Sequence, residues 1–188
     1  MKIIESDLRN KLIPIQDELP ELNSEFSVAA VLILLVKNND GWNILFTRRT
    51  NEVSTHQGEV SFPGGAFEKG DNSYFHTAIR ETEEEIGVTS ECIHILGRLG
   101  IHQTISRFSV YPFVGILTCE PVININKTEV ERVFLIPVDW LKDEKNFYLL
   151  DHDVYGHIVK NVLHYYDYEK EHLWGLTARI TQELLELI

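Results

Sequence analysis

The sequence is poor in cysteine and in basic residues. Its 188 residues include two cysteines, and 17 lysines and arginines stand against 29 aspartates and glutamates, for a formal net charge of −12 at pH 7. A general nucleic-acid binder usually carries a basic face, so the composition predicts no nucleic-acid partner. A small anionic ligand is not excluded, because metal ions and a few local arginines can reverse the sign of the charge inside one cleft.

Long apolar runs and a secretory signal are also missing. The longest apolar run, Val28 to Val36, is too short to span a bilayer. The first twelve residues, MKIIESDLRNKL, are amphipathic and acidic, unlike a signal peptide. Cys92 and Cys119 stand isolated, without a CxxC pair or zinc-site spacing, which fits a reduced cytosol. Together these features predict a cytoplasmic protein that does not bind membranes.

The pattern of apolar and turn residues predicts a mixed α/β (α+β) protein with most strands in the middle of the chain. Strands are expected over residues 26–37, 42–48, 93–101, 110–117 and 130–136, with a hairpin or strand pair over 154–166. Helices are expected over residues 5–22 with an interruption at Pro14, between residues 73 and 87, over 138–141 and over 176–187.

Nothing in the chain marks a second domain. There is no internal repeat, low-complexity tract or linker, so residues 1–188 are interpreted as one domain. Within it we distinguish an N-terminal helical extension (1–25), a Gly-Gly loop followed by a helix (58–88) and a C-terminal helix (173–188).

The helix before Gly87 has candidate N-caps at residues 71–73, and Gly87 is a good C-terminal stop. On a helical wheel one stripe is predicted to face the core; it contains Phe75, Ala78, Ile79, Thr82 and Ile86. The preceding Pro63-Gly64-Gly65 lets the backbone turn tightly and brings a bare carbonyl or amide close to a ligand.

The same helix ends in glutamates, where a helix is already partly negative. Glu81 and Glu85 are four residues apart and share a face with Glu84, whereas Arg80 and Glu83 are expected to point elsewhere. Each acidic residue in the last turn costs about 0.3–1 kcal/mol of helix stability. Convergent carboxylates suit Mg²⁺ or Mn²⁺, which take hard oxygen ligands. A charged surface helix is the alternative, and the spacing alone does not decide between them.

These residues resemble the Nudix box, G-x5-E-x7-R-E-U-x-E-E-x-G-U with U aliphatic. The matching residues are Gly65, Arg80, Glu81, Glu84, Glu85, Gly87 and Val88. The sequence departs from the pattern in three ways: Asp71 stands at the first Glu, eight residues instead of seven separate it from Arg80, and Thr82 replaces an aliphatic residue.

A second segment resembles one Nudix subgroup, the coenzyme A diphosphatases. Residues 45–50 (LFTRRT) and 58–65 (GEVSFPGG) are similar to its pattern LLTxRSxxxRxxxGxVxFPGG, except that Ser54 replaces the central arginine. Residues 173–180 (LWGLTARI) are similar to the I-W-G-x-T-A-x-I-L segment of the same subgroup. The resemblance runs from about residue 26 to the C-terminus.

The resemblance implies a Nudix fold, with a mixed sheet between helices. It implies Mg²⁺- or Mn²⁺-dependent hydrolysis of coenzyme A or its thioesters to phosphopantetheine and adenosine 3′,5′-bisphosphate, with a nucleotide diphosphate as the small-molecule partner. The sequence leaves the oligomeric state open, with a homodimer as one alternative. The metal ligands would be Glu81 and Glu85, with Glu84 and the Gly65 carbonyl close by. Arg80 belongs to the catalytic core of the box, and Gly64 and Gly65 border the substrate.

Several roles remain open from the sequence. Glu84, Glu129 and Glu131 are alternative acceptors for the proton of an attacking water. Arg48 and Arg49 are alternative phosphate ligands, and strand alternation sends only one of them to a given face. A surface salt bridge is the competing interpretation for each arginine.

The same residues leave room for other functions and other sites. A Nudix hydrolase acting on ADP-ribose, a dinucleotide or an oxidised nucleotide is the nearest alternative, and a Nudix-fold sensor that binds a nucleotide without cleaving it is a different class. The histidines and aspartates of 151–157 are interpreted as a polar hairpin loop, and His56 and His102 as ordinary surface or packed residues. Trp174 either stacks on an adenine or anchors the last helix.

Overall fold

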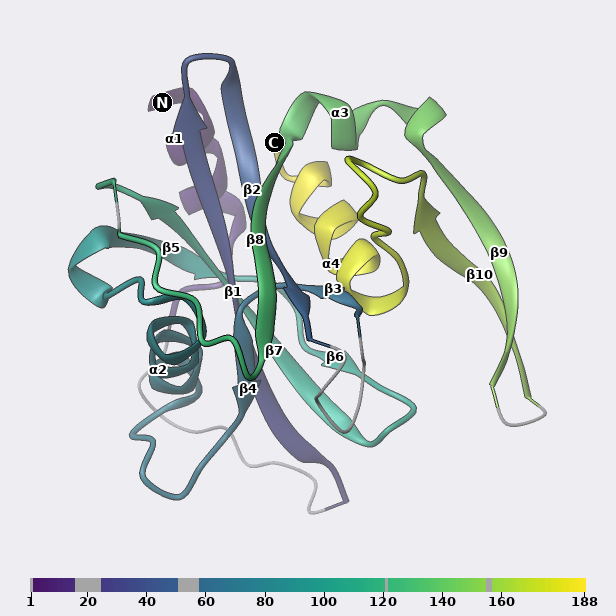
Figure 1. The fold of residues 1–188 in the computed structure, drawn as a ribbon, viewed down its shortest axis with the longest axis horizontal. Helices are drawn as coiled ribbons and strands as arrows, with labels where there is room; N and C mark the ends of the chain where they lie inside the picture. Colours follow the sequence, from purple (N-terminus) through teal and green to yellow (C-terminus); the bar gives the residue numbers. More distant parts are fainter. Residues whose placement is uncertain (1, 16–24, 51–57, 121, 155–156) are drawn as a thin grey trace.

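The computed structural model describes residues 2–15, 25–50, 58–120, 122–154 and 157–188 of the chain. Within these ranges an eight-stranded mixed sheet occupies the centre of the molecule, and a two-stranded hairpin stands beside it (Figure 1). The expected α+β class, with a mixed sheet between helices, is confirmed.

Strand β1 (Ser27–Asn38) is the central strand of the sheet. It pairs antiparallel with β2 (Gly41–Arg49) and β4 (Gly64–Ala66), and parallel with β7 (Phe108–Leu117). The remaining strands of the sheet are β3 (Val60–Ser61), β5 (Ile93–Arg98), β6 (His102–Gln103) and β8 (Val130–Pro137). Because β8 pairs with β2, the chain after residue 129 returns beside the strand that carries Arg48 and Arg49.

Alternation along β1 explains why the sheet is covered on both faces. Ile33 and Leu35 pack into one apolar cluster, and Leu32 and Leu34 pack into another. The first cluster includes residues of α1 (Lys2–Lys11), α3 (Val138–Lys142) and α4 (Gly175–Glu186), and the second includes residues of α2 (Tyr74–Ile86). The sheet therefore lies between α2 on one face and α1 and α4 on the other, as Figure 1 shows for α2 and α4.

The N-terminal helix is shorter than expected. The sequence predicts a helix over residues 5–22 with an interruption at Pro14, whereas α1 begins at Lys2 and ends at Lys11, before that proline. Ile13 then forms a β-bridge with Arg98, in which each backbone N–H donates to the other residue's carbonyl at 3.0 and 2.9 Å. Pro14 follows, and a proline disfavours helical backbone in the residue before it. Residues 16–24 lie outside the described ranges.

The segment around His152 is also different from the prediction. The hairpin consists of β9 (Phe147–Val154) and β10 (His157–Tyr165), so residues 151–153 lie in a strand and not in a loop. Asp151 and Asp153 are exposed, whereas His152 between them is half-buried. Alternating exposure of this kind fits a strand, and the polar residues around it masked that pattern in the sequence.

The two cysteines are joined, which corrects the interpretation that they are isolated. Cys92 ends the short 3₁₀ helix η1 (Ser90–Cys92), and it forms a disulfide with Cys119 although 27 positions separate them. The antiparallel pairing of β5 with β7 places Ile93 opposite Leu117, so the residues that flank this pair come together. A second 3₁₀ helix is η2 (Glu144–Asn146). Across the described ranges, no helix combines the length and apolarity needed to cross a membrane.

Candidate active site

Helix α2 begins and ends where the sequence predicts. The Ser73 side chain caps the first turn by accepting from the backbone N–H of His76 at 3.1 Å. Gly87 adopts a left-handed conformation with φ 75°, and its N–H donates to the Glu83 carbonyl. The buried face is rotated from the prediction, since it includes Tyr74, Thr77 and Glu85 and leaves Phe75 and Ile79 half-buried.

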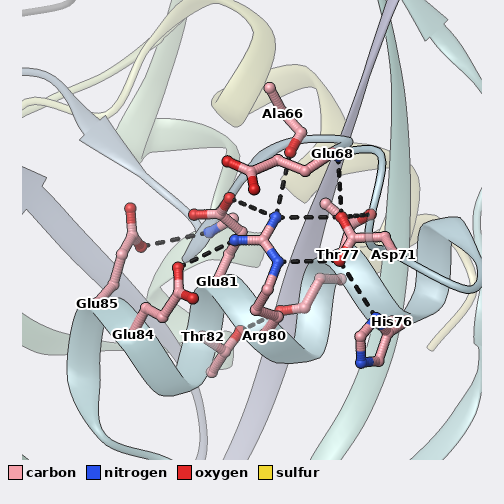
Figure 2. A network of polar contacts seen from close by, with 12 residues as sticks. Ala66, Glu68, Asp71, His76, Thr77, Arg80, Glu81, Thr82, Glu84 and Glu85 are labelled. Atoms are coloured by element: carbon pink, nitrogen blue, oxygen red, sulfur yellow. Dashed lines mark hydrogen bonds and ion pairs between the residues drawn. The ribbon is translucent and has the colours of Figure 1, made fainter.

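Arg80 lies at the centre of the acidic residues, not away from them as expected (Figure 2). Its Nε and Nη2 donate to the two carboxylate oxygens of Asp71 at 2.9 and 3.1 Å. Its Nη1 donates to Glu84 at 3.0 Å, and its Nη2 lies 2.9 Å from Glu81 Oε1. The expectation was wrong because Arg80 and Glu84 are four residues apart and so share a face, and because the long arginine side chain also reaches Glu81 and, before the helix, Asp71.

Asp71 pairs with Arg80 despite the eight-residue spacing. Asp71 precedes the helix, in a loop where its carboxylate also accepts from the Glu68 N–H at 3.0 Å and from Thr77 Oγ1 at 2.8 Å. The extra residue is absorbed by this loop, not by the helix. The bidentate contact with Arg80 holds the pKa of Asp71 well below its usual range and raises the pKa of Arg80. Arg80 therefore stays charged and fixes Glu81 and Glu84 in place.

The Gly-Gly loop brings backbone against the two inner glutamates. Gly64 has φ +151°, and an added Cβ would lie 2.3 Å from the Ala30 carbonyl oxygen. Its N–H donates to Glu85 Oε2 at 3.3 Å. A Cβ on Gly65 would lie 2.4–2.6 Å from the carboxylate atoms of Glu81. The pair of glycines is thus what allows the loop to sit directly on the helix.

The Glu85 carboxylate is buried and has few hydrogen-bonding or oppositely charged partners. Its side chain is 3% exposed, and besides the Gly64 N–H it has Arg49 Nη1 at 3.8 Å, beyond hydrogen-bonding distance. Burial raises the pKa of Glu85 to about 8, although Gly64 and Arg49 act in the opposite direction. Burial also raises the pKa of Glu81. A bound cation would stabilise both charged carboxylates.

The two arginines point to opposite sides, as strand alternation predicts. Arg49 extends toward Glu85, and its buried Nε has no hydrogen-bond partner within the described part of the chain. Arg48 instead donates through Nε to Glu131 at 3.1 Å and pairs with the buried Glu171 at 3.4 Å. The salt-bridge interpretation therefore describes Arg48, while Arg49 has unused donor capacity next to the helix.

The structure separates the three candidate proton acceptors. Glu131 is held by Arg48, and Glu84 is bound to Arg80 with its side chain 57% exposed. Glu129 lies close enough to Glu81 and Glu85 for its charge to contribute to the raised pKa of each. Its carboxylate accepts from the side-chain amide of Asn126 at 3.2 Å. Sequence reasoning overlooked this contact, although an asparagine in a turn three residues before a candidate base was a usable signal.

The expected convergence of Glu81, Glu84 and Glu85 is not seen. Over the described ranges no three His, Cys, Asp or Glu side chains are arranged to hold a metal ion. The physical reason is Arg80, which draws Glu84 outward and contacts Glu81. Nevertheless the Glu81 and Glu85 carboxylates and the Gly65 carbonyl are hard oxygen donors, and the uncompensated buried Glu85 is the group that a divalent ion would neutralise. These residues fit Mg²⁺ or Mn²⁺.

The remaining candidates have structural partners. His102 Nε2 lies 2.7 Å from Glu183 Oε2. Trp174 stacks on His152 and His164 with ring centroids 5.1 and 5.4 Å away, which supports the anchoring interpretation of this residue. Ser54 and His56 lie outside the described residues.

Comparison with known proteins decides the family. Residues 27–155, more than half of the chain, match the family model of the NUDIX domain. The chain belongs to the Nudix hydrolase family. It is an enzyme of that family, and the residues that resemble the Nudix box lie on α2 and the loop before it, within the matched range. Nudix hydrolases generally use divalent metal ions.

The relatives of this Nudix hydrolase agree on the family and the fold. It is 34% identical over 160 residues to a protein of Yersinia enterocolitica named "Uncharacterized Nudix hydrolase NudL", covering 85% of this chain and 80% of the relative. A MutT/nudix family protein from Enterococcus faecalis superimposes with TM-score 0.59 at 19% identity, over 88% of this chain and 63% of that chain. The NUDIX domain of Shewanella oneidensis NrtR complexed with ADP ribose gives TM-score 0.50 at 16% identity, over 63% and 76%.

Proposed function

We propose that this Nudix hydrolase cleaves the diphosphate bond of coenzyme A or its thioesters, giving phosphopantetheine and adenosine 3′,5′-bisphosphate. The resemblance of residues 45–50 and 58–65 to the coenzyme A diphosphatase pattern points to this substrate. The observation that carries the proposal is the position of Arg49, which matches the first arginine of that pattern. Arg49 lies 3.8 Å from the buried Glu85, with a guanidinium nitrogen that lacks a hydrogen-bond partner in the described residues.

The chemistry requires that a negatively charged diphosphate accept a nucleophile. A divalent ion at Glu81, Glu85 and the Gly65 carbonyl would neutralise substrate charge and lower the pKa of a bound water. Arg49 would bind a phosphate oxygen through its free donors. Glu129 would accept the proton of the attacking water, and Glu84 is the alternative acceptor. Arg80 keeps Glu81 and Glu84 oriented by its fixed pairing with Asp71.

The two adjacent arginines offer a matched test of the phosphate contact. Arg49→Ala should lower kcat/KM at least about tenfold, because a charge-assisted phosphate contact is lost. Arg48→Ala removes a charge of the same sign one residue away but only breaks the pairing with Glu131 and Glu171. Equal losses in the two variants would contradict the assignment of Arg49.

ADP-ribose is the second candidate substrate, because the NrtR domain of the same fold was solved with that ligand. Coenzyme A, ADP-ribose and NADH should be compared side by side with Mg²⁺ and with Mn²⁺, and the released products identified by mass spectrometry. We expect the highest kcat/KM with coenzyme A or a thioester. Faster release of AMP from ADP-ribose or NADH would overturn the substrate while leaving the enzyme class intact.

A cytoplasmic location and a homodimer are also part of the proposal. A reducing compartment keeps most thiols reduced. Alkylation of Cys92 and Cys119 in intact cells therefore tests the location: labelled cysteines agree with a cytoplasmic location, whereas unlabelled cysteines agree with the disulfide. Sedimentation of the purified chain tests the homodimer, and a monomer at micromolar concentration would contradict it.

A further inference from the structure

The loop before β8 is hydrogen-bonded to the last turn of α2. The backbone N–H of Asn124 donates to the Ile86 carbonyl at 3.0 Å, and that of Asn126 donates to the Glu85 carbonyl at 2.9 Å. A helix end leaves such carbonyls without intrahelical partners, so these bonds satisfy them. Asn126 is thereby fixed to the residue that carries the buried carboxylate of the site.

The side chain of Asn126 uses both ends of its amide. Its Oδ1 accepts from the backbone N–H of Thr128 at 3.2 Å and from Thr128 Oγ1 at 2.7 Å. Its Nδ2 donates to Glu129 Oε1 at 3.2 Å. A flipped amide would turn its NH2 toward the Thr128 N–H and its oxygen toward the Glu129 carboxylate, and both bonds would be lost, so the nitrogen must face Glu129.

Thr50, the residue that follows β2, holds the other side of this loop. The Thr50 N–H donates to the Glu129 carbonyl at 2.9 Å, and Thr50 Oγ1 donates to the Thr128 carbonyl at 3.1 Å. The backbone of Glu129 is therefore fixed between α2 and β2. What remains free to rotate is its side chain, and the Asn126 amide acts on that side chain.

We propose that Asn126 is a positioning residue of the hydrolytic site. Its amide holds the half-buried Glu129 carboxylate on the side of Glu81 and Glu85, where it can accept the proton of the attacking water. This inference rests on the proposed function. A donor fixed at both ends limits the rotamers of Glu129, and such orientation contributes to rate without any contact to the substrate.

The test compares two substitutions in the same turn. Asn126→Asp keeps the oxygen that accepts from Thr128 but replaces the amide donor by a carboxylate that repels Glu129. We expect kcat to fall about tenfold or more with KM little changed, since the substrate ligands are untouched. Thr128→Val removes the hydroxyl bond of the turn and keeps the amide donor. It should lower the melting temperature and keep most of kcat.

A double-mutant cycle shows whether Asn126 acts through Glu129. In a Glu129→Gln background, Asn126→Asp should cause no further loss of kcat, because residues that act as a unit are not additive. The inference is overturned by an additive loss, or by an equal fall of kcat in Thr128→Val.

A separate readout distinguishes this inference from the proposed function. If the wild type cleaves no substrate of the panel with either metal, the proposed function fails. The positioning contact is then judged by NMR, where Glu129→Ala should speed the hydrogen exchange of the Asn126 side-chain amide relative to the wild type. Unchanged exchange would overturn the contact itself.

Discussion

At the residue scale, the site depends on a missing side chain at Gly65. The Glu81 carboxylate occupies the space that a Cβ at this position would take, and it is held there by Arg80. The Gly65 carbonyl is also a candidate metal ligand. Any larger residue must therefore move the loop or Glu81, and either movement alters the donor set.

Gly65→Ala should reduce turnover by about 10–100-fold, the usual cost of disturbing groups that orient a metal ligand. Stability should fall by about 1–3 kcal/mol because the added methyl overpacks the loop. Steady-state kinetics and urea unfolding measure the two effects. Gly70→Ala, in the connection between β4 and α2, is the control, since its added Cβ meets no atom within 4 Å. Similar kinetics in the two variants would contradict the role of Gly65.

At the element scale, a chain of histidines fastens the β9–β10 hairpin to the segment before α4. His152 Nε2 lies 2.7 Å from His164 Nε2, His164 Nδ1 lies 3.0 Å from His172 Nε2, and His172 Nδ1 lies 2.9 Å from Asp167 Oδ1. Three neutral imidazoles can each donate one N–H toward Asp167. One added proton fits on the Nδ1 of His152. A second added proton would make the N–H groups of two neighbouring histidines point at each other, and the hydrogen bond between those rings would be lost.

This chain should make stability depend on pH. Burial, with the charges of His152 and His172, lowers the pKa of His164, so the folded protein binds fewer protons than the unfolded chain just below the ordinary histidine pKa of about 6.5. Stability is therefore complete above that pH and is lost as the pH falls. Urea unfolding from pH 7.5 to 5.5 should show a smaller loss in His164→Gln than in the wild type.

The exposed His94 on β5 provides the control for this pH dependence. His94→Gln should keep the wild-type slope, because His94 is paired with Glu5 and Arg9 away from the hairpin. A His164→Gln protein with an unchanged slope would show that the chain does not couple protonation to folding.

The disulfide joins the start of β5 to the end of β7, next to the end of the Nudix helix. Closing a loop between Cys92 and Cys119 should contribute about 2–4 kcal/mol to the free energy of unfolding. The double variant Cys92→Ser/Cys119→Ser should have a free energy of unfolding lower by that amount. Reductant should lower the free energy of unfolding of the wild type but not that of the variant. Guanidinium unfolding with and without reductant measures this; a wild type indifferent to reductant would show that the bond is absent.

At the scale of the whole molecule, folding and cation binding are linked. Burial raises the pKa of Glu81 and of Glu85, so folding with these groups costs free energy at neutral pH unless a cation compensates their charge. A ligand that binds only the folded state stabilises it by about 2.7 kcal/mol at 100 times its Kd. Saturating Mg²⁺ or Mn²⁺ should therefore raise the melting temperature.

Glu85→Gln should abolish both this shift and metal-dependent turnover, while its metal-free stability stays equal to or above that of the wild type, because on folding the wild-type carboxyl must either be buried as a charge or take up a proton. Glu83→Gln, an exposed neighbour on the same helix, should keep the shift and the turnover. Differential scanning calorimetry decides the point, and a wild type without any shift would count against the cation site.

The sequence by itself determined the features set by neighbouring residues. Ser73 and Gly87 start and stop the helix because capping is local, and the apolar run of β1 predicts a strand buried on both faces. Alternation was enough to send Arg48 and Arg49 to opposite sides. The spacing of the box identified the helix on which the carboxylates lie.

Only the tertiary structure decided which residues from distant parts of the chain come into contact. The pairing of β5 with β7 joins Cys92 to Cys119, and the long side chain of Arg80 joins Asp71 of the preceding loop to Glu81 of the helix. The return of the chain along β2 puts Glu129, and not Glu131, beside the helix. Strand register and side-chain reach set these contacts, and neither is encoded in the spacing of residues along one segment.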